Sequence, residues 1–275
     1  MELRPGLYIV STPIGNLSDI TIRALYVLNN CDIIYCEDTR ITQRLLQKHS
    51  IFGKKLSIYN DHSDSYSREK IVDKVRSGKI VVLVSDAGTP LIADPGYKIV
   101  RDIQKNNLLV DFIPGPCAAV SALVLSGMPT NKFFFAGFMP KTQISRDKLL
   151  GSLSDLDATL IFYDAPSRIL ETLKQIEITL GNREVAIVKE ITKVFQSVTR
   201  KKVTDLIESF NEISIRGEFV ILISPKLQEE IMDIQEIKHL VNEMRKNKMT
   251  SKDIAEILVK NYNKKLTKND IYRLY

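Results

Sequence analysis

The segment that most constrains the fold is an aliphatic strand that leads directly into a loop of small and rigid residues. Residues 80–84 are five successive aliphatics, as expected for a strand buried on both faces of a parallel sheet. Residues 87–90 leave backbone amides and carbonyls accessible. Asp94 is predicted to cap the next helix, with Pro95 as its first residue. Because ligands of open α/β sheets bind at the carboxyl ends of strands, this loop is predicted to contact a ligand.

The first part of the chain alternates apolar strands with amphipathic helices, which predicts a largely parallel α/β sheet. Strands are predicted at 7–11, 33–36, 56–59, 80–84 and 109–113, and helices near 19–30, 39–48, 66–77 and 95–106. The segment Pro114-Gly115-Pro116 then interrupts the pattern and is predicted to be a hinge between two lobes.

The second lobe is predicted to start with a helix at 117–126 and to contain a mixed sheet. Its strands are expected near 133–137, 158–163, 184–188, 194–199 and 218–223, and two of them follow each other without a helix. Pro225 ends this lobe. The predicted domains are therefore 1–114, 115–225 and 226–275.

The last domain is predicted to be helical and basic. Leu227, Ile231, Ile234, Val241 and Met244 lie near heptad spacing, and the segments 250–253 and 267–270 each resemble a helix-start box. Three short helices of this kind resemble a helix-turn-helix unit, although three-helix packing without any nucleic-acid role is equally compatible. Residues 244–275 hold nine Lys or Arg and three Asp or Glu, so a polyanionic partner or a merely soluble lysine-rich tail would both explain them.

Several classes of protein are disfavoured by what the sequence lacks. Residues 11–16 contain no G-x-G-x-x-G dinucleotide loop, and no G-x-x-x-x-G-K-[ST] phosphate loop occurs. No apolar run is long enough for a membrane span, and the first residues do not resemble a signal peptide. Neither the cysteines nor the histidines have metal-ligand spacing, so we expect no metal, reduced thiols and a cytoplasmic protein; these residues are Cys31, Cys36, Cys117, His49, His62 and His239.

Polar residues follow several of the predicted strands and are predicted to converge on a cleft between the lobes. They are Asp38, Arg40, His62, Lys189 and Glu190. For each segment alone, a solvated loop or a helix cap is the better interpretation, since Asp38 or Thr39 would also cap the following helix; the joint occurrence of these residues favours a common site.

Five segments, 7–20, 37–40, 84–96, 114–118 and 162–168, closely resemble the ribosomal RNA small subunit methyltransferase I family. They include Ser11-Thr-Pro-Ile-Gly-Asn16, Glu37-Asp-Thr-Arg40 and Phe162-Tyr-Asp-Ala-Pro-Ser-Arg168. That family is a branch of the tetrapyrrole-methylase-like (class III) methyltransferases. The resemblance implies two α/β lobes with S-adenosylmethionine in the cleft, a homodimer, and methylation of the ribose 2′-hydroxyl of a decoding-region cytidine in small-subunit ribosomal RNA.

The resemblance also implies roles for individual residues. Those that would line the cofactor site are Pro13, Asp86, Ala87, Gly88, Pro90, Leu91, Ile92, Gly115, Ser121, Phe138, Met139, Gly217, Glu218 and Phe219. Those that would face the RNA are Glu37, Asp38, Arg40, Lys189, Glu190 and Lys193. The chain departs from the family pattern at residues 60–64 and at Gln196, so His62 and Gln196 receive no catalytic role.

Methyl transfer from a sulfonium needs alignment of the reacting atoms and removal of the hydroxyl proton. Lys189 and Glu190 are the predicted groups for proton removal, with Asp38 orienting, although an ion pair that only stabilises the second lobe is the alternative. Two other functions remain open at this point. One is methylation of a corrinoid or another small tetrapyrrole, and the other is nucleic-acid binding through the tail without catalysis.

Overall fold

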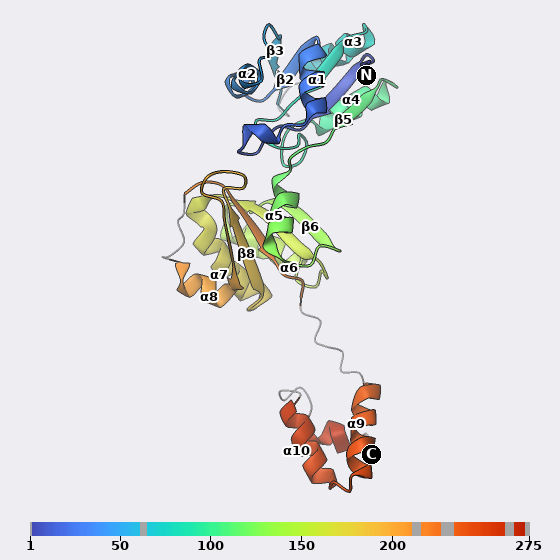
Figure 1. Cartoon of the computed structure of the whole chain (residues 1–275), viewed down its shortest axis with the longest axis vertical. Coiled ribbons are helices and arrows are strands. Elements are labelled where there is room, and N and C mark those ends of the chain that lie inside the picture. Colours follow the sequence, from blue (N-terminus) through green and yellow to red (C-terminus); the bar gives the residue numbers. More distant parts are fainter. Residues whose placement is uncertain (1, 61–64, 211–215, 227–233, 262–266, 273–275) are drawn as a thin grey trace. The chain divides into compact units, whose positions relative to one another are not determined.

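The computed structural model describes residues 2–60, 65–210, 216–226, 234–261 and 267–272. The chain divides into two compact units, Met1–Lys226 and Leu227–Tyr275 (Figure 1). The first unit contains two five-stranded sheets.

The first sheet is entirely parallel, as the alternating pattern predicts. In spatial order it consists of β3 (Leu56–Ile58), β2 (Ile33–Cys36), β4 (Ile80–Leu83), β1 (Gly6–Val10) and β5 (Val110–Ile113). The strands β1 and β2 are buried along their whole length because helices cover both faces of the sheet.

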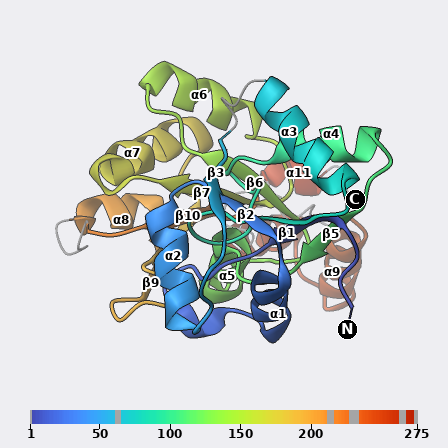
Figure 2. The ribbon, with the colours of Figure 1, turned by 90° about the horizontal axis from the view of Figure 1, so that it is seen from above.

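Those helices lie in pairs on opposite faces (Figure 2). On one face pack α1 (Ile22–Asn30), which follows the short 3₁₀ turn η1 (Leu17–Asp19), and α2 (Thr39–Lys48). On the other face pack α3 (Ser65–Arg76) and α4 (Tyr97–Lys105). The parallel strands therefore all end at one edge of the sheet, where the ligand loop was expected.

The second sheet is mixed, which confirms the prediction made from two strands without an intervening helix. Its order is β6 (Phe133–Phe138), β7 (Thr159–Asp164), β10 (Phe219–Ile223), β8 (Glu184–Lys189) and β9 (Ser197–Lys202). Only the pair β6 and β7 is parallel. One face is covered by α5 (Ala118–Ser126); the other is covered by α6 (Gln143–Ser152), α7 (Ile169–Leu180), which follows η2 (Pro166–Arg168), and α8 (Val203–Glu208).

Two predicted element boundaries were wrong. Asp94 does not cap α4: the cap position is Gly96, with φ 135°, and the helix starts at Tyr97. A Cβ atom at Gly96 would lie 2.6 Å from the Leu91 side chain, so the chain needs glycine where it turns into this helix. The strand expected near 194–199 is β9 at Ser197–Lys202, because the preceding residues form a hydrogen-bonded loop instead.

The second unit contains α9 (Ile234–Lys246), α10 (Ser251–Asn261) and α11 (Lys268–Tyr272). Both predicted helix-start boxes are confirmed. Thr250 Oγ1 accepts a hydrogen bond from the Asp253 amide at 3.2 Å, and Thr267 Oγ1 accepts one from the Asp270 amide at 3.2 Å. Leu227 and Ile231 lie outside the described residues, but Val241 belongs to the small core of this unit as expected.

Candidate active site

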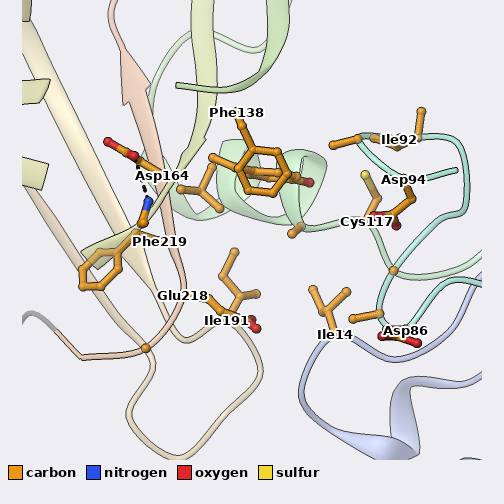
Figure 3. Close-up of a pocket in the computed structure, with 18 of the residues that line it drawn as sticks. Ile14, Asp86, Ile92, Asp94, Cys117, Phe138, Asp164, Ile191, Glu218 and Phe219 are labelled. Atoms are coloured by element: carbon orange, nitrogen blue, oxygen red, sulfur yellow. Dashed lines mark hydrogen bonds between the residues drawn. The ribbon is translucent and has the colours of Figure 1, made fainter. Parts of the chain in front are cut away.

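A cavity of about 590 Å³ lies in the first unit and takes its walls from both lobes (Figure 3). From the first lobe it is lined by Ile14, Glu37, Asp86, Ala87, Gly88, Thr89, Ile92, Ala93 and Asp94. From the second lobe it is lined by Cys117, Ala118, Phe138, Lys141, Tyr163, Asp164, Ala165, Pro166, Arg168, Ile191, Gly217, Glu218, Phe219 and Val220. Its size is typical of a site for a small-molecule ligand.

The loop after β4 is fixed across the carboxyl end of the sheet by a two-way backbone bridge. The Thr12 amide donates to the Gly88 carbonyl at 2.8 Å, and the Gly88 amide donates to the Thr12 carbonyl at 3.1 Å. The Thr89 hydroxyl donates to the Pro116 carbonyl at 2.9 Å, so the same loop is also tied to the segment that enters the second lobe. The loop is therefore held in place before any ligand binds.

The same loop contains backbone conformations that L residues rarely adopt. Leu91 and Ala93 have φ values of 72° and 66°, and Gly88 has a φ of 81°. Strain of this kind is of the order of 1–3 kcal/mol per residue and persists only where the surrounding structure enforces it. Here it keeps the loop extended over the cavity through Asp94 and delays the start of α4 to Tyr97.

Three carboxyl groups, Glu37, Asp86 and Asp94, face the cavity from the first lobe. Burial, with a smaller contribution from the neighbouring Glu37 carboxylate, raises the pKa of Asp94 to about 6. Burial also raises the pKa values of Glu37 and Asp86. A cationic ligand would stabilise the ionised forms of all three, so this wall of the cavity favours positive charge.

The opposite wall is organised by Asp164 at the end of β7. Its buried carboxylate accepts hydrogen bonds from the Thr172 hydroxyl at 2.6 Å, the Arg168 guanidinium at 2.8 Å and the Ala165 amide at 2.8 Å. These contacts fix the turn from β7 into η2, which presents Pro166 to the cavity. Asp164 is therefore a structural organiser whose charge is already balanced.

A second organising carboxylate, Glu190, connects the loop after β8 to the chain before β10. It accepts from the Glu218 amide at 2.9 Å and from the Lys193 ammonium at 3.0 Å. The Glu218 amide hydrogen bond lowers the pKa of Glu190, with Lys193 adding to the effect. A Cβ atom at Gly217 would overlap the Glu190 carboxyl group, which explains the glycine at that position.

The loop after β8 also contacts the first lobe. Thr192 Oγ1 accepts from the Asn16 amide at 3.0 Å, and a Cβ atom at Gly15 would lie 2.6 Å from Lys193. The Ile14 side chain packs into the core of the second lobe together with Ile191. The two lobes are therefore in direct contact beside the cavity.

The structure brings many of the predicted cofactor residues together. Those lining the cavity are Asp86, Ala87, Gly88, Ile92, Phe138, Gly217, Glu218 and Phe219. Those that do not line it are Pro13, Pro90, Leu91, Gly115, Ser121 and Met139. Of this second group, Met139 is buried in the core of the second lobe. Gly115 lies close to Ser11, since a Cβ atom at Gly115 would be 2.9 Å from the Ser11 side chain.

The predicted RNA-facing residues are more dispersed. Glu37 lines the cavity, whereas Asp38 and Arg40 form an exposed ion pair at 2.6 Å, which lowers the pKa of Asp38 to about 2. Lys193 is paired with both Glu190 and Glu218. His62 lies outside the described residues.

Lys189 is 8% exposed and does not line the cavity. Its ammonium makes no hydrogen bond or ion pair with the described residues and lies 5.9 Å from the centre of the Phe219 ring. The alternative in which Lys189 and Glu190 pair with each other is therefore not realised, because Glu190 pairs with Lys193 instead.

Sequence reasoning missed several residues of the cavity. Asp94 was interpreted as a helix cap, and Tyr163, Asp164 and Arg168 received no role although they lie in a segment that resembles the family. Their position directly after an apolar strand was the available signal, since the same argument was applied to residues 37–40.

Comparison with known proteins identifies the class. Residues 6–207 match the family model of the tetrapyrrole (corrin/porphyrin) methylases. Solved structures with this fold include a diphthine synthase, with a TM-score of 0.63, 13% identity and coverage of 79% of this chain and 89% of that one. They also include the cobalt precorrin-4 methyltransferase CbiF, with a TM-score of 0.58, 18% identity and coverage of 79% and 94%. At these identities the likeness concerns the fold alone.

Closer relatives are proteins named ribosomal RNA small subunit methyltransferase I. The one from Rickettsia prowazekii is 46% identical over 99% of this chain and 96% of its own length. The one from Thermotoga maritima is 43% identical over 80% of this chain and 98% of its own length, so a fifth of this chain has no counterpart there.

The chain belongs to the tetrapyrrole methylase family and, within it, to the ribosomal RNA small subunit methyltransferase I group. The methyl donor of this methyltransferase family is S-adenosylmethionine. The cavity suits that molecule: the apolar side chains of Ile14, Phe138 and Ile191 suit its hydrophobic parts, and the carboxylates suit its positive charge.

Gly88→Val is expected to abolish donor binding while the protein stays folded. The variant adds a branched side chain at φ 81°, and its Cβ would press on Ile14 at 3.3 Å, a residue of the cavity wall. The matched control is Gly78→Val, which introduces the same backbone strain at φ 88° with no atom within 4 Å. Calorimetric titration with S-adenosylmethionine checks this, and equal affinities for the two variants would remove Gly88 from the site.

Asp94→Asn is expected to stabilise the protein and weaken donor binding. In the folded state Asp94 retains a proton up to about pH 6, whereas its ordinary pKa is 3.8, so stability is lost as the pH rises from 3.8 to about 6 and the full loss is present above pH 6. At pH 7.5 the variant should gain roughly 1–3 kcal/mol in free energy of unfolding, and at pH 4 almost nothing.

Urea unfolding at both pH values, with exposed Glu69→Gln on α3 as control, measures this effect. A stability gain that is the same at pH 4 and pH 7.5 would contradict the assignment. So would donor affinity that is unchanged in Asp94→Asn at pH 7.5.

Proposed function

We propose that the protein transfers a methyl group from S-adenosylmethionine to the ribose 2′-hydroxyl of a cytidine in the decoding region of small-subunit ribosomal RNA, in the cytoplasm. The observation that carries the proposal is the match along nearly the full length to relatives named for this RNA, combined with a donor-sized cavity built from both lobes. Among the described residues no helix is long and apolar enough to cross a membrane.

The reaction requires the nucleophile, methyl carbon and sulfur to be aligned and the hydroxyl proton to be removed. Of the sequence-based candidates, Glu190 is engaged by Lys193 and the Glu218 amide, and its lowered pKa makes it a weak base. Lys189 lies outside the cavity wall, so in our proposal it contributes positive charge near Phe219. Asp38 orients its neighbours through its backbone amide, which donates to Asp86.

A corrinoid methylase is the main alternative because solved structures of that class share the fold. The relatives with 36–46% identity over nearly all of this chain are instead named for ribosomal RNA. This difference in similarity favours the RNA substrate.

The decisive experiment maps 2′-O-methyl groups on small-subunit RNA from cells with and without this gene. We expect one decoding-region cytidine to lose its 2′-O-methyl group and to regain it when purified protein and S-adenosylmethionine are added. An unchanged map, or a lost methyl group on a base rather than a ribose, would contradict the proposal.

We also propose a homodimer. α5 exposes Val120, Val124 and Leu125, and the edge strand β6 exposes Phe133 and Phe134. Water-exposed apolar side chains in this number on neighbouring elements are typical of an interface that a second copy covers.

Val124→Asp is expected to break the dimer, because it places a charge on a side chain that is 73% exposed and would be buried between the copies. Sedimentation should give twice the 31.2 kDa chain mass for the unmodified protein and the single mass for the variant. Ile178→Asp, at an equally exposed apolar position on α7, is the control and should remain dimeric. A monomeric unmodified protein at micromolar concentration would contradict the proposal.

The second unit is proposed to bind RNA without taking part in the chemistry. Its charge is polarised along the chain: residues 227–243 hold five acidic residues and one lysine, whereas residues 244–275 hold nine basic and three acidic ones.

Truncation after Lys226 is therefore expected to leave donor binding intact, weaken RNA binding and flatten its salt dependence. If about three lysines contact phosphates, the slope of log affinity against log salt should fall by roughly two to three units. A salt titration of both proteins on the same ribosomal substrate measures this. An identical slope would assign the unit to packing or assembly.

A further inference from the structure

A second cavity, of about 230 Å³, lies in the first lobe. It lies beside the cavity of about 590 Å³ that suits S-adenosylmethionine, the donor cavity. Its apolar walls are Pro13, Leu17, Ile41 and Leu45, from the loop after β1, the η1 turn and α2. It is smaller than the roughly 300–1,000 Å³ of sites for larger organic ligands, and apolar walls of this kind suit one flat ring.

The two cavities meet at Asp86, the residue that lines both. Two consecutive residues of the loop after β1 line different cavities: Ile14 lines the donor cavity, and Pro13 lines the smaller one. Asp86 is therefore placed between a donor in one cavity and an acceptor in the other.

The Asp86 carboxylate is oriented by backbone. One oxygen accepts from the Asp38 amide at 3.0 Å, and the other has no hydrogen-bond partner among the described residues. The Asp86 amide itself donates to Glu37 at 3.3 Å. Asp86 thus has one oxygen fixed and one available.

The outer side of the smaller cavity is basic. Arg44 lines it, is exposed, and its guanidinium makes no hydrogen bond or ion pair within the described part of the chain. Arg40 and Lys48 lie four residues before and after it on α2, so the three cations share one face of the helix. Such a row suits the phosphates on either side of an extruded nucleotide.

We propose that the smaller cavity holds the base of the RNA nucleotide to be methylated, and that Asp86 accepts the proton of its ribose hydroxyl. This inference rests on the proposed function, and it assigns an acceptor site and a base that the sequence-based candidates did not include. Arg44 binds the adjoining phosphate, and the Asp38 amide positions Asp86.

In the reaction the ribose oxygen forms a bond to the methyl carbon as the bond from that carbon to the sulfonium sulfur breaks. The sulfur keeps the electron pair and leaves as a neutral thioether, and the hydroxyl proton passes to the free oxygen of Asp86. Burial raises the pKa of Asp86, which makes this carboxylate a better proton acceptor than an exposed one.

The first test fills the smaller cavity. Ile41→Trp is tolerable for folding because Ile41 is 40% exposed, and Ile178→Trp on α7 is the matched control. Without donor, Ile41→Trp should bind ribosomal substrate at least about tenfold more weakly than the control, a loss of roughly 1.4 kcal/mol. Affinity for S-adenosylmethionine should be equal in both. If Ile41→Trp binds the ribosomal substrate with wild-type affinity and has the wild-type KM for it, the assignment of the smaller cavity as the acceptor site is wrong.

The second test addresses the base. Asp86→Asn should lower kcat about 10²–10⁴-fold and abolish the acidic limb of its pH profile, while RNA affinity changes little. The other charged groups around Asp86 are Glu37, Asp38, Asp94, Arg40 and Arg44. Because Asp94→Asn is expected to weaken donor binding, it is run beside Asp86→Asn at saturating donor, where it should keep the acidic limb of kcat. The assignment of Asp86 as the proton acceptor would be overturned if Asp86→Asn kept the acidic limb of the pH profile. It would also be overturned if only Lys189→Met lost that limb. No methyl transfer to ribosomal RNA by the unmodified protein would instead contradict the proposed function itself.

Discussion

The structure of the active site depends on two hydrogen bonds between the Thr12 and Gly88 backbones. They join the loop after β1 to the loop after β4 beyond the point where their strands separate. Because Gly88 has a φ of 81°, the connection is available to glycine and strained for other residues. The strained residues Leu91 and Ala93 follow in the same loop, and strain of this kind persists only where the surrounding structure enforces it.

The second lobe uses carboxylates for the same purpose. Asp164 and Glu190 are satisfied by hydrogen bonds from neighbouring backbone and basic side chains, and each fixes one loop at the end of a strand. Their charges are therefore used for structure. The carboxylates of Glu37, Asp86 and Asp94, which face the cavity from the first lobe with raised pKa values, are available to a ligand. This division separates the groups that build the site from those that can act in it.

The sequence predicted the fold because the signals were regular: uninterrupted aliphatic strands, helix-start boxes at Thr250 and Thr267, and two strands without a helix between them. It predicted the start of α4 wrongly because the order Asp94-Pro95 resembles a helix cap, whereas the loop conformation that carries Asp94 to the cavity depends on contacts between distant segments. It assigned Glu190 to proton removal because the hydrogen bond from the Glu218 amide to this carboxylate becomes visible only when the chain before β10 lies beside the end of β8.

The central claim is that one donor molecule contacts loops of both lobes. Hydrogen exchange with and without S-adenosylmethionine tests it most directly, because the amides of each loop report separately. We predict slower exchange on binding in residues 86–94 of the first lobe and in residues 190–193 and 217–220 of the second. Protection confined to one lobe, or absent from residues 86–94, would contradict this account.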